Sequence, residues 1–563
     1  MRLSPLCAAA LALAACSGPA PGPAPDAGEK VTVFTNGTIY TGLADPVTVD
    51  GIVVGADGRI IATIPPMSAD WGDDSEINLV DLGGAFLYPG FTDAHAHLLG
   101  IGQRELTLNL EGTASVAELV TRVEAELQGL EPGVVLFGRG WIETGWPEGR
   151  MPSAADLDAV SPDNPVVLFR ADGHALVANT AALQAASILD PVPDPEGGKV
   201  ERGADNLATG IVIDNAMAPV AALLADPTMA ELERAYEVGS KTYAARGWTG
   251  VHNMSVDPLH APLLQQLSEA GKLPLRLYNA FDEAGFDIAE GRQFETPTIT
   301  NRTVKLYMDG ALGSRGAQLI QPYSDRPETS GLSLVDDDRL AALMARAKAA
   351  NVQLAIHAIG DLANRRILEA FETGGYGPEL RWRIEHTQVL HPDDIARVGA
   401  LGLIASMQPS HAIGDLHFAP ARLGLDRLRG AYAWASLIAS GAHLAGGSDA
   451  PVEVGSALIE FYAAVARKDL KGFTGEGWHP EEALTRSQAL GLFTTGPAYA
   501  AFQDADLGTI EPGKLADFSV FDRDLMIVPE GDILNVQPVM TVIGGKVVWR
   551  REAGESEQQD GPG

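Results

Sequence analysis

A pair of histidines separated by one residue is the clearest chemical motif in the sequence. His95 and His97 end the stretch Pro89-Gly90-Phe91-Thr92-Asp93-Ala94-His95-Ala96-His97. Residues two apart in an extended strand point to the same side, so both imidazoles would converge at one strand end. Two converging imidazoles are a natural start for a zinc-type site. The alternative is a pair of structural histidines, each satisfied by a hydrogen bond.

Four more side chains suited to metal binding or proton transfer occur later in the chain. They are Lys305 in an apolar run, His357 and His386 at the ends of such runs, and Asp449 after a glycine-rich turn. Taken singly, each has a structural explanation: a lysine reaching the strand end, a buried histidine or an aspartate that caps a turn. Taken together, they would lie on one face of a parallel barrel with the histidine pair.

Short apolar strands alternate with helical segments through the middle of the chain. Such alternation predicts a parallel sheet, and eight units predict a closed (β/α)8 barrel, here at residues 89–495. Residues of about 104–245 break the repeat and predict an insertion after the first strand. Helices are expected at Asp337–Ala350 and Leu362–Thr373. The expected strands are Phe86–Ala94, Gly250–Asn253, Leu275–Ala280, Val304–Met308, Val352–Ile356, Trp382–Glu385, Leu403–Met407 and Ala442–Ala445.

The two flanks of the barrel have a different texture. Residues 31–88 and 496–551 contain β-branched runs between turns such as Asn36-Gly37 and Gly544-Gly545. We therefore expect an α/β protein whose barrel carries a composite β-sandwich built from both flanks. Residues 16–30 are rich in Pro, Ala and Gly and predict a tether, and residues 552–563 predict a disordered tail.

The first fifteen residues have the form of a secretory signal. Arg2 precedes about a dozen apolar residues, too few for a membrane span. Leu13-Ala14-Ala15-Cys16 resembles the lipobox of bacterial lipoproteins, which implies cleavage of residues 1–15 and acylation of Cys16. The resemblance implies a lipid-anchored protein of the bacterial envelope that faces the periplasm, on the outer membrane. Ordinary cleavage near Ala15 is the alternative and would give a secreted or periplasmic protein.

Composition excludes several classes of function. The chain has 563 residues, 40 Lys and Arg against 74 Asp and Glu, and a net charge of −34. This negative charge repels nucleic acid and disfavours a basic patch for acidic lipids, so membrane contact is expected only through the lipid anchor. Cys7 and Cys16 are the only cysteines, which excludes four-thiolate metal sites and disulfide frameworks.

The order of the chemical residues resembles the amidohydrolase superfamily of metal-dependent hydrolases. More narrowly, it resembles the amidohydrolase 3 branch that contains N-substituted formamide deformylase. The resemblance covers residues of about 31–551. Supporting stretches are Gly140-Trp141, Trp146-Pro147-Glu148-Gly149-Arg150, Asp172-Gly173-His174, Asp309-Gly310-Ala311-Leu312-Gly313-Ser314-Arg315 and Pro512-Gly513-Lys514-Leu515-Ala516-Asp517-Phe518.

This resemblance implies a centre of one or two divalent metals, with zinc as the expected ion. His95 and His97 would hold one metal, and Lys305, carboxylated by CO2, would bridge to a second. The ligands of the second metal would be His357 and His386. Asp449 would bind metal and move the proton as an activated water attacks an amide, N-acyl or N-formyl carbonyl. Asp93 and Asp361 are expected to orient ligands or to cap turns.

Substrate contacts are expected from four residues, and each has a structural alternative. They are His411 and Arg315 near the barrel mouth and His174 and Trp141 in the insertion. The expected partner is a small amide, and a homodimer is left open. Other functions also remain open: an isomerase or lyase reaction of a related barrel, dipeptidase activity, or a metal-free envelope binding lipoprotein.

Overall fold

The computed structural model describes residues 30–43, 47–65, 77–143, 146–171, 173, 175–195, 198–224 and 227–552. The predicted signal peptide, the lipidated Cys16 and its tether up to residue 29, and the tail from residue 553 lie outside these residues. The described chain forms two compact units. One combines the residues up to Leu98 with those from Ser240 onward, and the other runs from Leu99 to Gly239. Among the described residues, no helix has both the length and the apolar character needed to cross a membrane.

The first unit contains the predicted barrel. Within the described residues, eight parallel strands follow one another in the order β19-β18-β17-β16-β15-β14-β13-β6. Their bounds are β6 (Phe91–Ala96), β13 (Trp248–Val256), β14 (Arg276–Phe281), β15 (Ile299–Tyr307), β16 (Gln353–Ala358), β17 (Arg383–His386), β18 (Ile404–Met407) and β19 (His443–Gly446). Each strand predicted from the sequence therefore overlaps one of these barrel strands, and the (β/α)8 class is confirmed.

The barrel closes between its first and last strands just beyond the end of β19. The backbone N–H of Asp449 donates to the carbonyl of His95 at 2.6 Å, and the N–H of His97 donates to the carbonyl of Ala450 at 2.8 Å. These two hydrogen bonds hold the segment that carries Asp449 against the strand that carries the histidine pair. Closure of the barrel and assembly of the candidate site therefore depend on the same contact.

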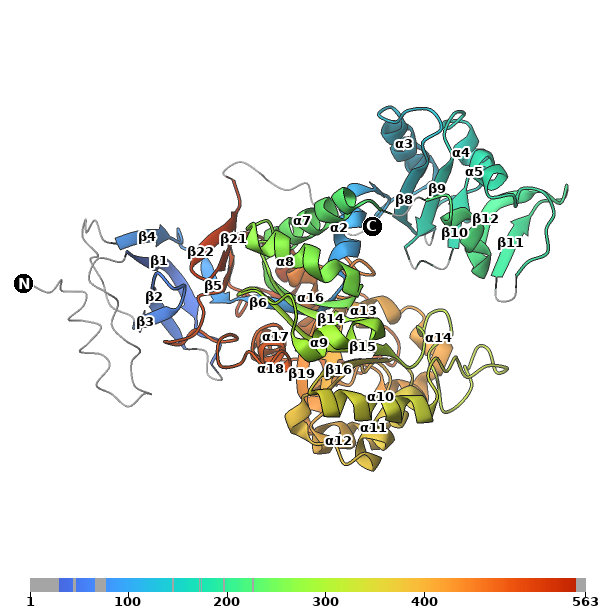
Figure 1. Ribbon diagram of the computed structural model, residues 1–563. Coiled ribbons are helices and arrows are strands. Elements are labelled where there is room, and N and C mark those ends of the chain that lie inside the picture. The colour runs from blue at the N-terminus through green and yellow to red at the C-terminus, as the bar shows by residue number, and fades with distance from the viewer. Residues whose placement is uncertain are drawn as a thin grey trace, which may run out of the picture. The chain divides into compact units, whose positions relative to one another are not determined.

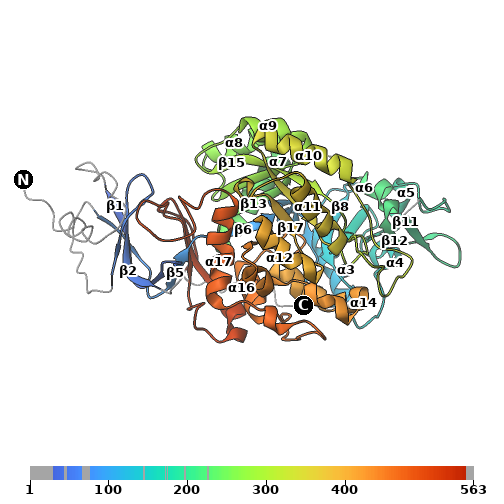
Figure 2. The same cartoon turned by 90° about the horizontal axis from the view of Figure 1, so that it is seen from below.

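Helices cover the outside of the strands (Figure 1, Figure 2). Their bounds are α8 (Ala261–Glu269), α9 (Phe286–Gly291), α10 (Asp337–Ala350), α11 (Asp361–Thr373), α12 (Pro392–Leu401), α13 (Pro409–Asp415), α14 (Ala419–Leu423), α15 (Trp434–Ala439), α16 (Ala457–Ala466), α17 (Arg486–Phe493) and α18 (Thr495–Ala500). Local sequence fixes α10 at both ends: the Asp336 side chain accepts the N–H of Arg339, and Asn351 ends the helix with a φ of 53°.

The expected strand Phe86–Ala94 is wrong in one respect, because it is two strands that belong to different sheets. β5 (Phe86–Pro89) joins the flanking sheet, and β6 begins the barrel after Gly90. A Cβ atom at Gly90 would lie 2.3 Å from Oγ1 of Thr249, so a side chain there would collide with β13. A glycine is needed at the point where the chain passes from one sheet to the other.

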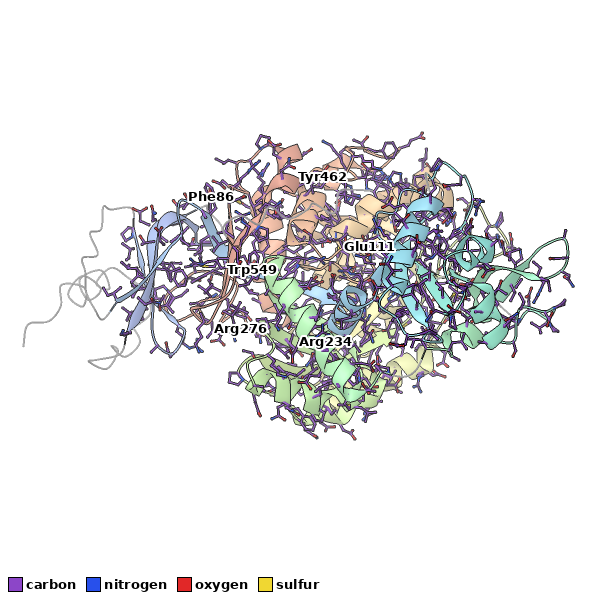
Figure 3. The ribbon with its side chains drawn as sticks, turned by 90° about the horizontal axis from the view of Figure 1, so that it is seen from above. Phe86, Glu111, Arg234, Arg276, Tyr462 and Trp549 are labelled. Atoms are coloured by element: carbon purple, nitrogen blue, oxygen red, sulfur yellow. The ribbon has the colours of Figure 1, made fainter. Side chains whose placement is uncertain are left out.

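The flanking sheet is built from both ends of the chain, as predicted. Its order is β22-β21-β20-β5-β1-β2-β3, with β4 beside β1. Figure 3 labels Phe86 on β5 and Trp549 on β22, strands that come from opposite ends of the chain. The bounds are β1 (Val31–Tyr40), β2 (Thr48–Val54), β3 (Ile60–Ile64), β4 (Ile77–Asp81), β20 (Phe518–Phe521), β21 (Pro538–Ile543) and β22 (Lys546–Arg550).

The second unit, Leu99–Gly239, overlaps the insertion expected at about 104–245. Its sheet has the order β11-β12-β10-β9-β8-β7. The strands are β7 (Leu108–Asn109), β8 (Leu136–Trp141), β9 (Val166–Arg170), β10 (Ala175–Ala178), β11 (Gly198–Arg202) and β12 (Ala208–Asp214). The helices that lie wholly or mostly in it are α2 (Leu98–Leu106), α3 (Val116–Leu127), α4 (Ala154–Asp158), α5 (Thr180–Ala185), α6 (Ala218–Ala221) and α7 (Met229–Ala245).

Candidate metal centre

The histidine pair lies at the end of β6, and both rings present the same nitrogen to Asp449. Nε2 of His95 is 3.4 Å and Nε2 of His97 is 3.1 Å from Oδ1 of Asp449. The opposite nitrogens are held by oxygens, because Nδ1 of His95 lies 2.6 Å from Oε2 of Glu385 and Nδ1 of His97 lies 3.1 Å from the Met254 carbonyl. An oxygen acceptor at Nδ1 keeps the proton on that nitrogen and leaves a lone pair on Nε2, the form in which histidine binds metal.

His386 joins this group from the end of β17. The centre of its ring lies 4.9 Å from that of His95 and 4.5 Å from that of His357 on β16. Its Nδ1 lies 2.8 Å from Oε1 of Gln408, which again leaves Nε2 with a lone pair. Burial is the main cause that lowers the pKa of both His386 and His357, so both rings are held in the neutral form that metals require.

The backbone at His386 explains how this ring reaches the centre. Glu385 and His386 are neighbours, and regular strand geometry would put their side chains on opposite faces. The φ angle of His386 is +74°, in the left-handed region that non-glycine residues seldom adopt. This turn lets Glu385 and His386 both contribute to one site.

Lys305 lies on β15 and is 2% exposed. Its Nζ lies 4.4 Å from the centre of the Tyr307 ring, and within the described residues it forms no hydrogen bond or ion pair. Burial lowers the pKa of the Lys305 ammonium, while the charges of Glu385 and Asp449 oppose that effect. A buried amine in this setting is closer to the uncharged, nucleophilic form than an exposed lysine is.

Asp449 is the point on which these side chains converge. It follows β19 with a φ of 61°, and it is 8% exposed. Burial favours its neutral form, but the imidazoles of His95 and His97 prevail and lower the pKa of Asp449 well below its usual value. The carboxylate is therefore charged within a ring of imidazoles.

His411, predicted as a substrate contact, also lies beside Asp449. It belongs to α13, and its Nε2 is 3.6 Å from Oδ2 of Asp449. Two sets of side chains each bring one ligand atom apiece to within 4.8 Å of one another: His95, His97 and Asp449, and His386, His411 and Asp449. The second set contains His411, whereas the sequence suggested that His357 would bind metal together with His386.

The donors fit a divalent metal. In the described part of the chain, the buried Nε2 atoms of His95, His357 and His411 have no hydrogen-bond partner. A buried polar atom without a partner is costly, and a cation bound between these nitrogens and the Asp449 carboxylate would give each of them a partner. Imidazole and carboxylate ligands suit zinc and other first-row metals.

A buried ion pair contacts the centre through Glu385, and it was not predicted from the sequence. Arg383 is 0% exposed, and its Nε lies 2.7 Å from Oε1 of Glu385. The same guanidinium donates to the Ala94 carbonyl at 2.6 Å and approaches Nδ1 of His252 at 2.7 Å. The available signal was two opposite charges, Arg383 and Glu385, at alternate positions of an apolar strand.

Buried aspartates accept hydrogen bonds from the segments that carry or adjoin the candidate ligands. Asp93 accepts the N–H of His95 at 3.0 Å and the hydroxyl of Ser448 at 2.6 Å, so it links β6 to the turn that precedes Asp449. Asp361, expected to orient a ligand or to cap a turn, accepts the N–H of Ile320 at 2.8 Å. Asp309 is the carboxylate beside His357, with Oδ1 3.4 Å from Nε2.

The other predicted substrate contacts have different surroundings. Arg315 donates from Nε and Nη2 to the carboxylate of Asp325, at 3.1 and 2.8 Å, which is the loop ion pair considered as its alternative. Trp141 is 0% exposed within the second unit, where its indole N–H donates to the Leu168 carbonyl at 2.9 Å. His174 lies outside the described residues. Substrate binding by these three residues stays a prediction.

Comparison with known proteins gives a consistent result along most of the chain. Residues 78–549 match the model of the amidohydrolase family. The protein LONG AFTER FAR-RED 3 of Arabidopsis thaliana is 32% identical over 92% of this chain and 91% of its own length. The N-substituted formamide deformylase of Arthrobacter pascens is 27% identical over 89% of this chain and 94% of its own. A crystal structure of an uncharacterized metal-dependent hydrolase from Pyrococcus horikoshii OT3 covers 89% of this chain and 99% of its own, with 29% identity and a TM-score of 0.73.

Proposed function

Since the chain belongs to the amidohydrolase family and is thus a hydrolase, we propose that it cleaves a non-peptide carbon–nitrogen bond. The bond is that of an amide, N-acyl or N-formyl group in a small molecule. The observation that carries this proposal is the convergence of histidine Nε2 lone pairs on the charged, buried carboxylate of Asp449.

The ligand set follows from this geometry together with the family resemblance. His95, His97 and Asp449 would hold one metal, and His357 and His386 would hold a second, with His411 beside them. Zinc is the ion we propose, because neutral imidazoles and a carboxylate are ligands that it accepts. A divalent metal in this place supplies an activated water and polarises the carbonyl of the substrate.

Lys305 completes the site as a carbamate. Its uncharged amine attacks CO2, a nitrogen–carbon bond forms, and one proton is released to solvent. The product carries two oxygens and a negative charge, whereas an ammonium has no lone pair to offer a metal. The burial of Lys305 and the pKa that burial lowers support this assignment.

The residues of the chain handle the proton and keep the ligands in place. The Asp449 carboxylate accepts a proton from the attacking water and returns it to the nitrogen as the carbon–nitrogen bond breaks. Glu385 and Gln408 hold the rings of His95 and His386 in the tautomer that faces the centre. Asp93 fixes the turn before Asp449.

The relative that is named N-substituted formamide deformylase supports formamides as the first substrates to test. For the location of the protein, we retain the proposal of a lipid-anchored envelope protein that faces the periplasm. It rests on the sequence of residues 1–16 alone.

The test is to purify the chain from Ser17 onward from cells supplied with zinc and bicarbonate, and to measure metal per chain together with hydrolysis of a chromogenic amide. A panel of 4-nitroformanilide, 4-nitroacetanilide and N-acyl amino acids covers the proposed bonds. We expect one or two metals per chain and hydrolysis of at least one compound. Lys305→Ala should lower both readouts, whereas Lys348→Ala on the exposed face of α10 should change neither. A folded wild type that binds metal and hydrolyses none of these bonds would contradict the proposal.

A further inference from the structure

A pair of hydroxyl groups lies beside the candidate metal centre and takes no part in the proposed metal binding or proton transfer. Ser255 is near the end of β13, and Tyr307 is the last residue of β15. Their side-chain oxygens are hydrogen-bonded to each other. In the barrel, β14 lies between these two strands, so the hydrogen bond crosses above the end of β14.

An irregularity in β13 creates this contact. The pairing register between β13 and β14 shifts between Asn253 and Val256, and Ser255 has a φ of 55°. A positive φ at a non-glycine residue is uncommon, and such residues are enriched at functional sites. The same irregular segment presents the Met254 carbonyl to Nδ1 of His97 at 3.1 Å, so it already serves the metal centre.

The ring of Tyr307 lies directly over two candidate ligands. Nζ of Lys305 is 4.4 Å from the ring centre, and the His357 ring centre is 5.6 Å from it. Lys305 and Tyr307 are two residues apart on one strand and therefore share a face. Nevertheless, Tyr307 is 37% exposed, whereas Lys305 beside its ring is only 2% exposed. One part of the ring packs on the centre, and another part is open to a molecule that enters from solvent.

The two hydroxyl groups carry one hydrogen more than the bond between them uses. Two hydroxyl groups carry two hydrogens, and the bond between Ser255 and Tyr307 uses one of them. In the described structure, neither oxygen makes a second hydrogen bond to another residue. One O–H donor thus remains on the pair, and the tyrosine ring of the pair lies beside Lys305 and His357.

We propose that the Ser255–Tyr307 pair donates this remaining hydrogen to the carbonyl oxygen of the substrate. The inference rests on the proposed function and names a catalytic contact for it. As the water oxygen bonds to the carbonyl carbon, the π electron pair of the C=O bond moves onto the carbonyl oxygen. The hydroxyl hydrogen bond stabilises that developing negative charge, and no proton is transferred to it. When the electron pair returns, the carbon–nitrogen bond breaks and the nitrogen leaves with the proton delivered by Asp449.

The proposal explains why the donor is a pair. A lone tyrosine hydroxyl at the end of a strand can rotate toward bulk water, whereas the serine fixes its direction. Donors that are oriented before the reaction lose no free energy in reorganising, and the loss of one such donor lowers kcat by roughly 100- to 1,000-fold.

The experiment compares Tyr307→Phe, Ser255→Ala and the double variant, with 4-nitroformanilide as the probe. Tyr307→Phe keeps the ring over Lys305 and removes only the hydroxyl. We expect kcat to fall by roughly 100- to 1,000-fold, with KM within about threefold of the wild type and metal content unchanged. If the two hydroxyls act as one donor, the double variant will be no slower than the slower single variant. Tyr376→Phe, which alters a ring packed on Phe371 and Trp382, is the matched control and should be as active as the wild type.

Three results would overturn the proposal. The first is a kcat for Tyr307→Phe within about twofold of the wild type. The second is a loss of activity that follows a loss of metal, which would make Tyr307 a support for Lys305. The third is equal or absent binding of inorganic phosphate, a tetrahedral oxyanion, by Tyr307→Phe and Tyr376→Phe. This test is used if the wild type does not hydrolyse 4-nitroformanilide, so that the proposed function fails for this substrate, and calorimetry on the zinc-loaded proteins measures the affinity. Weaker phosphate binding by Tyr307→Phe than by Tyr376→Phe supports the donor.

Discussion

Glu385 and His95 are 290 residues apart in the sequence, and Oε2 of Glu385 lies 2.6 Å from Nδ1 of His95. Both side chains are at most 1% exposed. The carboxylate also neutralises the buried guanidinium of Arg383, with 2.7 Å between Oε1 and Nε. One side chain therefore sets the tautomer of a candidate ligand and compensates a buried positive charge. These charges also explain why the pKa of Glu385 is far below its usual value: burial raises it, but Arg383 and His95 lower it more.

Replacement of this carboxylate by an amide should affect stability and metal binding together. Glu385→Gln keeps the shape of the side chain but leaves Arg383 without a counter-charge. We expect the free energy of unfolding to fall by about 3–5 kcal/mol, as when one partner of a buried ion pair is removed. We also expect metal affinity to fall by roughly 10- to 100-fold, because His95 loses its charged acceptor. Chemical denaturation and zinc titration measure the two effects.

The exposed ion pair between Glu372 and Arg397, with 2.8 Å between its charged atoms, gives the matched control. Glu372→Gln should cost only about 0–1 kcal/mol, because solvent screens that pair. If the Glu385 and Glu372 variants lose equal stability, the buried charge network does not have the role assigned to it.

Gly447 should not tolerate a side chain, because it lies where the barrel closes. A Cβ atom there would be 2.4 Å from the backbone nitrogen of His95. Gly447→Ala should therefore separate β6 from the segment that carries Asp449, lower the free energy of unfolding by about 1–3 kcal/mol and reduce bound metal. Gly531 has no atom within 4 Å of the corresponding position, so Gly531→Ala should behave as the wild type in melting and elemental analysis. Normal metal content in a destabilised Gly447→Ala would separate closure of the barrel from assembly of the site.

The fold and the positions of His95, His97 and Lys305 could be predicted because each depends on strand periodicity, which is a local property of the sequence. Glu385, the hydrogen-bond partner of His95, could not be predicted in this way. Regular alternation would place Glu385 and His386 on opposite faces, and only the positive φ of His386 brings both to the centre. The residue types give no signal of that angle.

Loops set a second limit on sequence-based prediction. The Arg315 guanidinium could pair with a substrate carboxylate or with an aspartate of a nearby loop. It pairs with Asp325 because of the path that the chain takes after β15. The predicted strand Phe86–Ala94, which Gly90 divides into β5 and β6, shows that strand pairing is also hard to predict from the sequence. An apolar run such as Phe86–Ala94 does not reveal that its two halves pair with different sheets.

The stability of the protein should depend on pH through Asp415, at the end of α13. Its carboxylate accepts a hydrogen bond from Gln388 at 2.6 Å and another from the Tyr432 hydroxyl. Burial raises the pKa of Asp415 to about 7, although the bond from Tyr432 and the charge of Arg422 act in the opposite direction. Because the folded state holds the proton more tightly than the unfolded state, this contribution to stability is complete below about pH 4 and is lost as the pH rises through about 7.

Asp415→Asn removes this titration, so the fall in melting temperature between about pH 5 and about pH 8 should be smaller than in the wild type. Asp393→Asn, at an exposed aspartate on α12, should keep the slope of the wild type. Equal slopes in the wild type and the two variants would assign the pH dependence to other groups.

Removal of metal should destabilise the barrel, because the Nε2 atoms of His95, His357 and His411 then have no partner within the described structure. A ligand that binds only the folded state at 100 times its Kd adds about 2.7 kcal/mol, so zinc should raise the melting temperature relative to chelator-treated protein. His386→Ala removes a ring near the middle of the cluster and should abolish most of this rise. His391→Ala, which changes a partly exposed histidine at the start of α12, should retain it even if its own melting temperature falls. A zinc-dependent rise that is the same in both variants would mean that the stabilising metal binds elsewhere in the protein.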